Sequence, residues 1–508
     1  MRAEIDNRPF PTPPAAFNMA AHVLAASAAR LPDKPALQIL RTNGAERWSY
    51  ARLLAAVQGC GAGLLARGLV PGDRVLMRLG NQVEFPILFL GALSVGLVPV
   101  ATSSQLTREE ITPMAAHVTP RLIVAAPGIA LPDHPAPVLT EAEIRAMEGL
   151  PPAPFDMGDP HRPGYIIFTS GTSGRPMAVV HAHRAILGRQ MMHQGWEGLG
   201  EADRLLHAGA FNWTYTLGTG LMDPWTLGAT ALIPGPGVAP AQLGLLMKRF
   251  DATILAAAPG VYRQLLRGPL PPLPRLRHGL SAGEKLSAET RAAWVAATGT
   301  PVYEALGMSE ISTFISASPA RPAPEGTTGF AQPGRHIAAL GADGRPVARG
   351  EAGQLAVNRD DPGLMLAYLD APEATAARRS GPWFLTGDTV SIAEDGAVTY
   401  LGRADDQMNA GGYRVSPAEV EAAMQRLDGL TEAAVTEVEV RPGVTIIACF
   451  YTAPAPLDPS VLTAHAEAHL ARYKQPRAFV RLDSLPRNAN AKLNRRALRA
   501  HDLKGQTP

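Results

Sequence analysis

The segment from Tyr165 to His183, YIIFTSGTSGRPMAVVHAH, constrains the fold more than any other part of the sequence. The apolar runs Tyr165–Phe168 and Ala178–Val180 each predict a buried strand, and the polar residues Thr169–Gly174 predict a flexible loop between them. Glycines and hydroxyl side chains let such a loop turn its backbone N–H groups inward, towards phosphate oxygens. It is not a Walker motif, because no Gly-Lys-Ser/Thr closes it and no long helix follows. A Ser/Gly-rich hairpin loop without a ligand is the alternative.

The length and composition exclude a small or disordered protein. The chain has 508 residues, of which 46% are hydrophobic and 18% are charged, so several cores are expected. Its net charge of +2 gives no general reason to expect nucleic acid or an acidic membrane surface as a partner. Cys60 and Cys449 lie far apart in apolar contexts, which indicates neither a disulfide framework nor a zinc site. A reducing cytoplasm fits this usage.

The sequence predicts neither secretion nor a membrane span. The N-terminal residues lack the apolar core of a signal peptide. The run from Phe85 to Ala101 is uncharged and about as long as a minimal span, but it is interrupted by Pro86, Gly91, Gly96 and Pro99. A buried helix that leads into a core strand is therefore expected, and no membrane partner.

Helix and strand patterns alternate through the first part of the chain. Helices are expected at Met19–Arg30 and Ser49–Arg67, and strands at Arg74–Met77, Val98–Val100 and Arg121–Val124. Such alternation is typical of parallel sheets covered by helices, so the predicted fold class is α/β.

Two later regions have different patterns. From Gly326, short strands between Gly, Pro and Asp turns predict a β-rich subdomain. From Pro417, helices and strands alternate in a pattern that predicts a small α+β module.

The loop resembles the phosphate-binding loop of the adenylate-forming superfamily, which contains acyl- and aryl-CoA synthetases, luciferases and the adenylation domains of peptide synthetases. The family pattern runs roughly T-S-G-T-T-G-x-P-K-G, and this chain has Met177 where the family usually has lysine. His181, His183 or Arg184 is the hypothesised replacement for that charge. Further segments similar to family motifs follow in the family's order: Ser281–Glu284, Tyr303–Glu310, Trp383–Asp388, Gly402–Glu421 and Pro486–Arg495.

The resemblance implies a site for ATP and AMP. Thr169, Glu310 and Lys492 are the implied catalytic residues, and Glu310 is the implied Mg²⁺ ligand, because a hard cation prefers carboxylate oxygen where phosphate charge gathers. Asp388 is expected on the ribose hydroxyls. The residues implied to bind ATP or AMP are Thr169, Ser170, Gly171, Thr172, Ser173, Gly174, Ser281, Gly283, Glu284, Glu304, Ala305, Ser309, Asp388, Arg403 and Lys492.

The resemblance also implies an acid and coenzyme A site and a mobile lid. Asp405 is the implied hinge between an N-terminal adenylation domain of stacked sheets, residues 1–404, and a small C-terminal lid domain, residues 405–508. Trp213 is the implied aromatic gate of the pantetheine tunnel. The residues implied to contact the acid or coenzyme A are Trp213, Tyr215, Gly307, Gly411, Gly412 and Tyr413.

The implied activity is ATP-dependent ligation of a carboxylic acid to coenzyme A through an acyl-AMP intermediate, with release of AMP and pyrophosphate. Segments Phe211–Tyr215 and Ser281–Lys285 are similar to those of benzoate-type and medium-chain enzymes, so an aromatic or other compact acid is expected. A short- or medium-chain fatty acyl-CoA synthetase, or a degenerate member that binds nucleotide or acyl-adenylate with little turnover, remains an alternative. ATP, Mg²⁺, coenzyme A and a small acid are the expected ligands, and a homodimer is left open.

Overall fold

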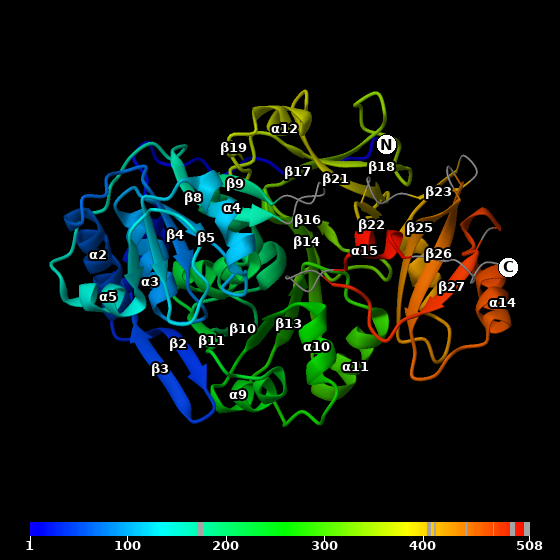
Figure 1. The fold of residues 1–508 in the computed structure, drawn as a ribbon, viewed down its shortest axis with the longest axis horizontal. Coiled ribbons are helices and arrows are strands. Elements are labelled where there is room, and N and C mark those ends of the chain that lie inside the picture. The colour runs from blue at the N-terminus through cyan, green and yellow to red at the C-terminus, as the bar shows by residue number, and fades with distance from the viewer. Residues whose placement is uncertain are drawn as a thin grey trace. The chain divides into compact units, whose positions relative to one another are not determined.

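A computed structural model of the chain gives the arrangement of its elements (Figure 1). The structure describes residues 1–169, 176–403, 408–410, 413–441, 444–470, 472–487 and 493–501. The chain divides into two compact units. The large unit comprises residues 5–337 and 357–384, and the small unit comprises residues 1–4, 338–356 and 385–508.

The longest sheet of the large unit has the strand order β16-β15-β14-β13-β12-β10-β11-β2-β3. Neighbouring strands from β2 to β14 run parallel, whereas β3, β15 and β16 pair antiparallel. Near-continuous apolar runs are typical of a parallel sheet that is buried on both faces. The strands are β2 (Pro35–Arg41), β3 (Gly44–Ser49), β10 (Arg204–His207), β11 (Thr230–Pro234), β12 (Ile254–Ala257), β13 (His278–Ala282), β14 (Val302–Met308), β15 (Ser312–Ser316) and β16 (Phe330–Ala331).

A second sheet of the large unit holds the segment on both sides of the phosphate loop. Its strand order is β19-β9-β8-β5-β4-β6-β7, with β8 antiparallel to β9 and parallel to β5. The strands are β4 (Arg74–Arg78), β5 (Val98–Ala101), β6 (Leu122–Ala125), β7 (Val138–Thr140), β8 (Pro163–Thr169), β9 (Met177–Ala182) and β19 (Ala367–Tyr368).

Helices α2 (Tyr50–Ala66) and α3 (Glu84–Ser94) pack closely against each other. A Cβ atom added at Gly91 would lie 2.9 Å from Cys60 Cβ, so a side chain at Gly91 would force these helices apart. Helix α3 is buried along its length and is followed by β5, which confirms the expected buried helix and strand between Phe85 and Ala101. Every helix within the described residues is too short or too polar to span a bilayer.

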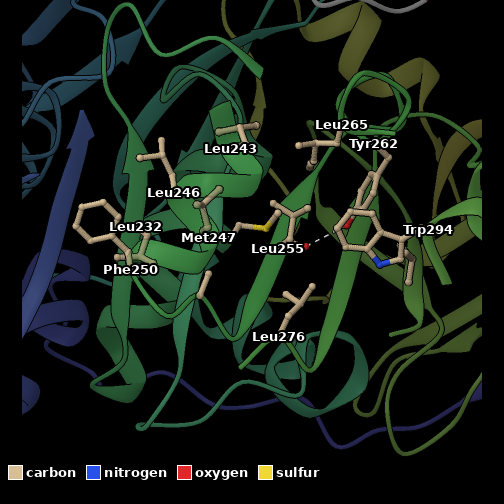
Figure 2. Close-up of a cluster of buried hydrophobic side chains, with 14 of the residues drawn as sticks. Leu232, Leu243, Leu246, Met247, Phe250, Leu255, Tyr262, Leu265, Leu276 and Trp294 are labelled. Atoms are coloured by element: carbon tan, nitrogen blue, oxygen red, sulfur yellow. Dashed lines mark hydrogen bonds between the residues drawn. The ribbon is translucent and has the colours of Figure 1, made fainter. Parts of the chain in front are cut away.

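Helices α9 (Leu243–Arg249), α10 (Pro259–Leu265) and α11 (Ala288–Thr298) pack against strands of the nine-stranded sheet and form a hydrophobic core with them (Figure 2). Tyr262 and Trp294 meet edge to face, with ring centroids 4.9 Å apart. The Tyr262 hydroxyl donates to Leu255 O at 3.1 Å and to Leu280 O at 3.0 Å. The aromatic pair therefore ties α10 and α11 to neighbouring strands β12 and β13.

A third sheet contains strands from the region that follows Gly326, as the β-rich pattern predicts. Its order is β1-β17-β18-β21-β20, and β22 pairs with β21. The strands are β1 (Glu4–Asp6), β17 (His336–Leu340), β18 (Ala352–Asn358), β20 (Arg379–Ser380), β21 (Trp383–Ile392) and β22 (Val398–Arg403).

The C-terminal part of the small unit is the predicted α+β module. Successive residues of its central strands alternate between two cores: Val435 and Cys449 belong to one, and Ala434 and Phe450 belong to the other. The α/β fold class is confirmed, whereas Asp405, the predicted domain boundary, lies outside the described residues. The elements are β23 (Met408–Ala410), β24 (Tyr413–Val415), α13 (Pro417–Met424), β25 (Glu432–Arg441), β26 (Val444–Thr452), α14 (Pro459–His469), β27 (Ala478–Arg481) and α15 (Arg495–Arg499).

Candidate active site

Strands β8 and β9 carry the two ends of the phosphate loop. They pair antiparallel, with Thr169 opposite Met177, so the two predicted strands are confirmed. Thr169 and Met177 are both half-buried. The remaining predicted loop residues, Ser170, Gly171, Thr172, Ser173 and Gly174, lie outside the described residues.

Two of the three side chains hypothesised to replace the missing lysine are neutral histidines. Burial lowers the pKa of His181 to about 4 and that of His183 to about 3, so both rings are uncharged at neutral pH. His181 Nε2 lies 2.8 Å from Ser309 O, and His183 Nδ1 accepts a hydrogen bond from Met19 N–H. Arg184 donates to the backbone carbonyls of Pro362 and Leu364. The hypothesis of charge compensation is therefore wrong for His181 and His183, which are neutral. For Arg184 it stays a prediction.

The end of β13 brings predicted nucleotide and acid residues together. Ser281 is fully buried, and its Oγ has no hydrogen-bond partner among the described residues. Gly283 has φ +95°, and a Cβ atom there would lie 2.8 Å from Trp213 Cζ2. The Tyr215 hydroxyl donates to Leu280 O at 3.0 Å, and its ring meets that of Trp213 edge to face, with ring centroids 5.3 Å apart. The two aromatic rings therefore lie against the predicted adenine-side loop.

The turn between β14 and β15 holds Glu310. Glu310 is buried, and its carboxylate accepts a hydrogen bond from the Tyr368 hydroxyl at 2.6 Å. Its backbone oxygen accepts from Met365 N–H at 2.7 Å. A Cβ atom at Gly307 would lie 2.4 Å from Ser312 O, so this turn needs glycine for its close backbone approach. Tyr368 is a neighbour of Glu310 that the sequence did not predict.

Glu304 and Ala305 lie on β14, but the Glu304 side chain has structural partners. Its carboxylate accepts from Leu286 N–H at 3.1 Å and from Arg291 Nη2 at 2.9 Å. Burial raises the pKa of Glu304, and the charge of Arg291 opposes that shift. The backbone of Glu304 pairs with Ser281 on β13, which keeps this strand beside the adenine-side loop. Glu284 follows Gly283 and is half-buried.

In the small unit, Asp388 and Arg403 stand opposite each other on β21 and β22. Arg403 Nη1 lies 3.5 Å from Asp388 Oδ1 and donates to Thr386 O at 3.3 Å. The hairpin of β21 and β22 therefore places Asp388, the residue expected on the ribose, next to Arg403. Tyr413 belongs to β24. Asp405, Gly411, Gly412 and Lys492 lie outside the described residues, and their roles stay predictions.

The fold, and the order in which these segments enter it, are those of an adenylate-forming enzyme. Residues 24–369 match the family described as AMP-binding enzyme, and residues 419–492 match the AMP-binding enzyme C-terminal domain. The chain therefore belongs to the AMP-binding enzyme family. The predicted superfamily and the predicted enzyme type, an AMP-forming acid–thiol ligase, are confirmed.

Characterised relatives resemble the chain over nearly its full length. The benzoate–CoA ligase of Thauera aromatica is 30% identical over 487 residues, covering 90% of this chain and 92% of that protein. The mitochondrial acyl-coenzyme A synthetase ACSM5 of Homo sapiens is 28% identical over 542 residues, covering 96% and 91%. The crystal structure of a benzoate CoA ligase from Burkholderia xenovorans LB400 has a TM-score of 0.85 at 26% identity, covering 95% of this chain and 100% of that chain.

Replacing Gly283 tests the contact between the adenine-side loop and Trp213. Gly283→Ala should reduce kcat/KM by roughly tenfold or more, because the new methyl group displaces the Trp213 ring. The positive φ of alanine at this position costs about 1–3 kcal/mol in addition. Gly299→Ala is the matched control, since Gly299 has φ +71° with no atom within 4 Å of an added Cβ. Steady-state kinetics and melting temperatures compare the two. If Gly283→Ala and Gly299→Ala change kcat/KM and the melting temperature equally, the contact with Trp213 has no role in the reaction.

His183 also predicts a dependence of stability on pH. Its pKa falls to about 3 in the fold, below the ordinary value of about 6.5, so the unfolded chain takes up the proton first as the pH falls. The free energy of unfolding should be independent of this group above about pH 6.5 and should decline below it by up to about 1.4 kcal/mol per pH unit. His183→Asn keeps an acceptor for Met19 N–H without titrating, so urea unfolding should show a shallower decline. An unchanged slope would show that the pKa of His183 is not lowered in the folded protein.

Proposed function

We propose that the enzyme ligates an aromatic or other compact carboxylic acid to coenzyme A. The observation that carries this proposal is the pair of aromatic side chains, Trp213 and Tyr215, packed beside the end of β13 next to the predicted nucleotide loop. Flat aromatic rings bury a large area at low conformational cost and suit a flat substrate ring. The benzoate–CoA ligase among the relatives supports the same class of acid.

The residues around Glu310 fit a magnesium ion. Mg²⁺ in nucleotide sites is held by one or two carboxylates together with phosphate oxygens and water. Glu310 supplies one buried carboxylate, and no lysine or arginine within the described ranges lies at ion-pair distance from it. Glu310 would hold the ion, which neutralises phosphate charge when bound.

In the first half-reaction, the acid carboxylate attacks the α-phosphorus of ATP, which forms acyl-AMP and releases pyrophosphate. The carboxylate is already a nucleophile, so the protein mainly needs to orient the two substrates and stabilise developing charge. In the proposed arrangement the backbone N–H groups of the phosphate loop bind the phosphates, Asp388 accepts from the ribose hydroxyls and Arg403 assists beside it. Lys492 contacts the carboxylate and the α-phosphate.

In the second half-reaction, the coenzyme A thiol attacks the acyl carbonyl, and AMP leaves. We place the change between the two halves at Asp405, with rotation of residues 405–508 against residues 1–404. Gly411 and Gly412 let pantetheine pass close to the backbone, and Tyr413 and Gly307 lie along its predicted path. The homodimer and the cytoplasmic location stay predictions from the sequence.

A panel of acids tests this proposal. Purified protein with ATP, Mg²⁺ and coenzyme A should release AMP and pyrophosphate with benzoate and substituted benzoates at higher kcat/KM than with butyrate, hexanoate or octanoate. Higher kcat/KM with the aliphatic acids would identify a short- or medium-chain fatty acyl-CoA synthetase instead. Binding of ATP without release of AMP for any acid would identify a degenerate member.

Met177 favours the degenerate alternative, because no lysine follows the phosphate loop at that position. If a charge there binds the β- and γ-phosphates, Met177→Lys should lower the KM for ATP by an amount equivalent to about 1.5–3 kcal/mol at most, with little change in acid selectivity. If the half-buried thioether is packed instead, the ammonium group should lower the melting temperature. Unchanged ATP kinetics together with unchanged melting temperature would show that position 177 does not face the nucleotide.

A further inference from the structure

A buried arginine connects two helices of the large unit to the turn that holds Glu310. Arg189 lies on α6 (Ala185–Met192), and its Nε donates to Asp223 Oδ1 at 2.9 Å. The side chains of Arg189 and Asp223 are 6% and 0% exposed, so this is a buried ion pair. Arg189 Nη2 also donates to Thr219 Oγ1 at 3.1 Å, and Nη1 donates to Ser312 Oγ. Every nitrogen of the guanidinium group therefore has a partner.

A second carboxyl group, that of Glu197, lies beside this ion pair. Glu197 is completely buried, and burial together with the negative charge of Asp223 raises its pKa well above the ordinary value. Burial acts to raise the pKa of Asp223 as well, but the charge of Arg189 outweighs it and holds that pKa well below its usual range. The two shifts run in opposite directions, so Asp223 is the carboxyl group whose negative charge is stabilised beside Arg189, and the charged form of Glu197 is disfavoured. His193 Nε2 lies 3.7 Å from Asp223 Oδ1.

The backbone around the ion pair is unusual in two places. Glu197 ends one π-helix, η2 (His193–Glu197), and Thr219 lies in another, η3 (Gly218–Met222). π-Helical turns are rare in proteins and are frequent at functional sites. A Cβ atom at Gly218 would lie 1.9 Å from Arg189 Cζ, so the guanidinium group packs directly on the backbone of η3.

Ser312, the residue that receives the Arg189 Nη1 hydrogen bond, has a left-handed backbone. Its φ is +76°, which is uncommon for a residue with a side chain and is retained only where the surroundings hold it. Ser312 follows Glu310 by two residues, and its carbonyl oxygen is the atom that approaches Gly307. The conformation of Ser312 therefore shapes the turn that contains Glu310.

We propose that Arg189 is a positioning residue for the ligase reaction, because the Arg189 cluster, made of Arg189, Glu197, Thr219 and Asp223, holds Ser312 and so orients Glu310. This inference rests on the proposed function of Glu310 in binding the metal and nucleotide. Arg189 itself touches no reacting atom. The alternative is an ion pair that contributes only to stability. Buried ion pairs can often be replaced by apolar side chains without loss of stability.

The first test measures the turn without substrates, by hydrogen–deuterium exchange of the apoprotein. Arg189→Lys keeps the charge but loses the fork of donors, and Gly218→Ala pushes the guanidinium group away without removing it. Both should accelerate exchange at residues 308–312 by about tenfold. This is the effect expected from losing one hydrogen bond to a charged group. Glu197→Gln should leave exchange there unchanged, because the carboxyl oxygens of Glu197 have no hydrogen-bond partner among the described residues.

Asp203→Asn is the matched control for stability alone. It disrupts another ion pair of the large unit, Arg277–Asp203, in which Asp203 is buried and the closest atoms are 2.7 Å apart. This variant should lower the melting temperature without changing exchange at residues 308–312. If Arg189→Lys and Gly218→Ala behave in the same way as Asp203→Asn, the positioning role is overturned. Exchange in Glu197→Gln as fast as in Arg189→Lys would overturn the claim that the hydrogen bond from Arg189 to Ser312 holds the turn.

The second test measures the Mg²⁺ dependence of ATP binding by calorimetry and of AMP release by kinetics. In Arg189→Lys, the Mg²⁺ concentration that gives half-maximal ATP binding and AMP release should rise by about tenfold. Adding Ser312→Gly to this variant should reverse part of that rise, since glycine adopts a positive φ freely. An unchanged Mg²⁺ dependence in Arg189→Lys would overturn the link to Glu310. A wild-type protein without AMP release would contradict the proposed function, whereas the exchange measurements would still decide whether Arg189 holds the turn.

Discussion

The parallel pairing of β13 with β14 is the constraint on which the rest of the site depends. The register places Ser281 beside Glu304 and Ala282 beside Ala305, and parallel strands end at the same edge of a sheet. The loop after β13 and the turn after β14 therefore emerge together, although they are separate in the sequence. Packing of α10 and α11 through Tyr262 and Trp294 supports these same strands from one face.

The segment that contains Glu310 is irregular, so a strand ladder alone cannot hold it. Two buried arginines bind its neighbours instead. Arg189 donates to Ser312, and Arg335 donates to Thr313 O at 2.9 Å and to Gly188 O at 2.8 Å while it pairs with Asp361. Burying a charged pair costs solvation energy, and its partners must be placed accurately to offset that cost. This requirement links the geometry of the turn to the packing of α6, which carries Arg189 and also contacts β15.

Local patterns predicted the strands beside the phosphate loop and the buried helix α3, because each depends on residues close together in the chain. The order of the motif segments came from their resemblance to the family. Tyr368 was missed because it lies 58 residues from Glu310, and no local pattern indicates that contact. Arg189 was missed because a single arginine in a helix usually faces solvent. The hypothesis that His181 or His183 supplies a charge failed because burial, which sets the charge of a histidine, depends on tertiary packing.

In the proposed reaction, the enzyme forms an acyl-adenylate before coenzyme A takes part. Isotope exchange between labelled pyrophosphate and ATP measures this step directly, in the absence of coenzyme A. The proposed chemistry predicts exchange that requires Mg²⁺ and an aromatic or other compact acid and that disappears when the acid is omitted. Absence of exchange with every acid, in a folded protein that binds ATP, would contradict it.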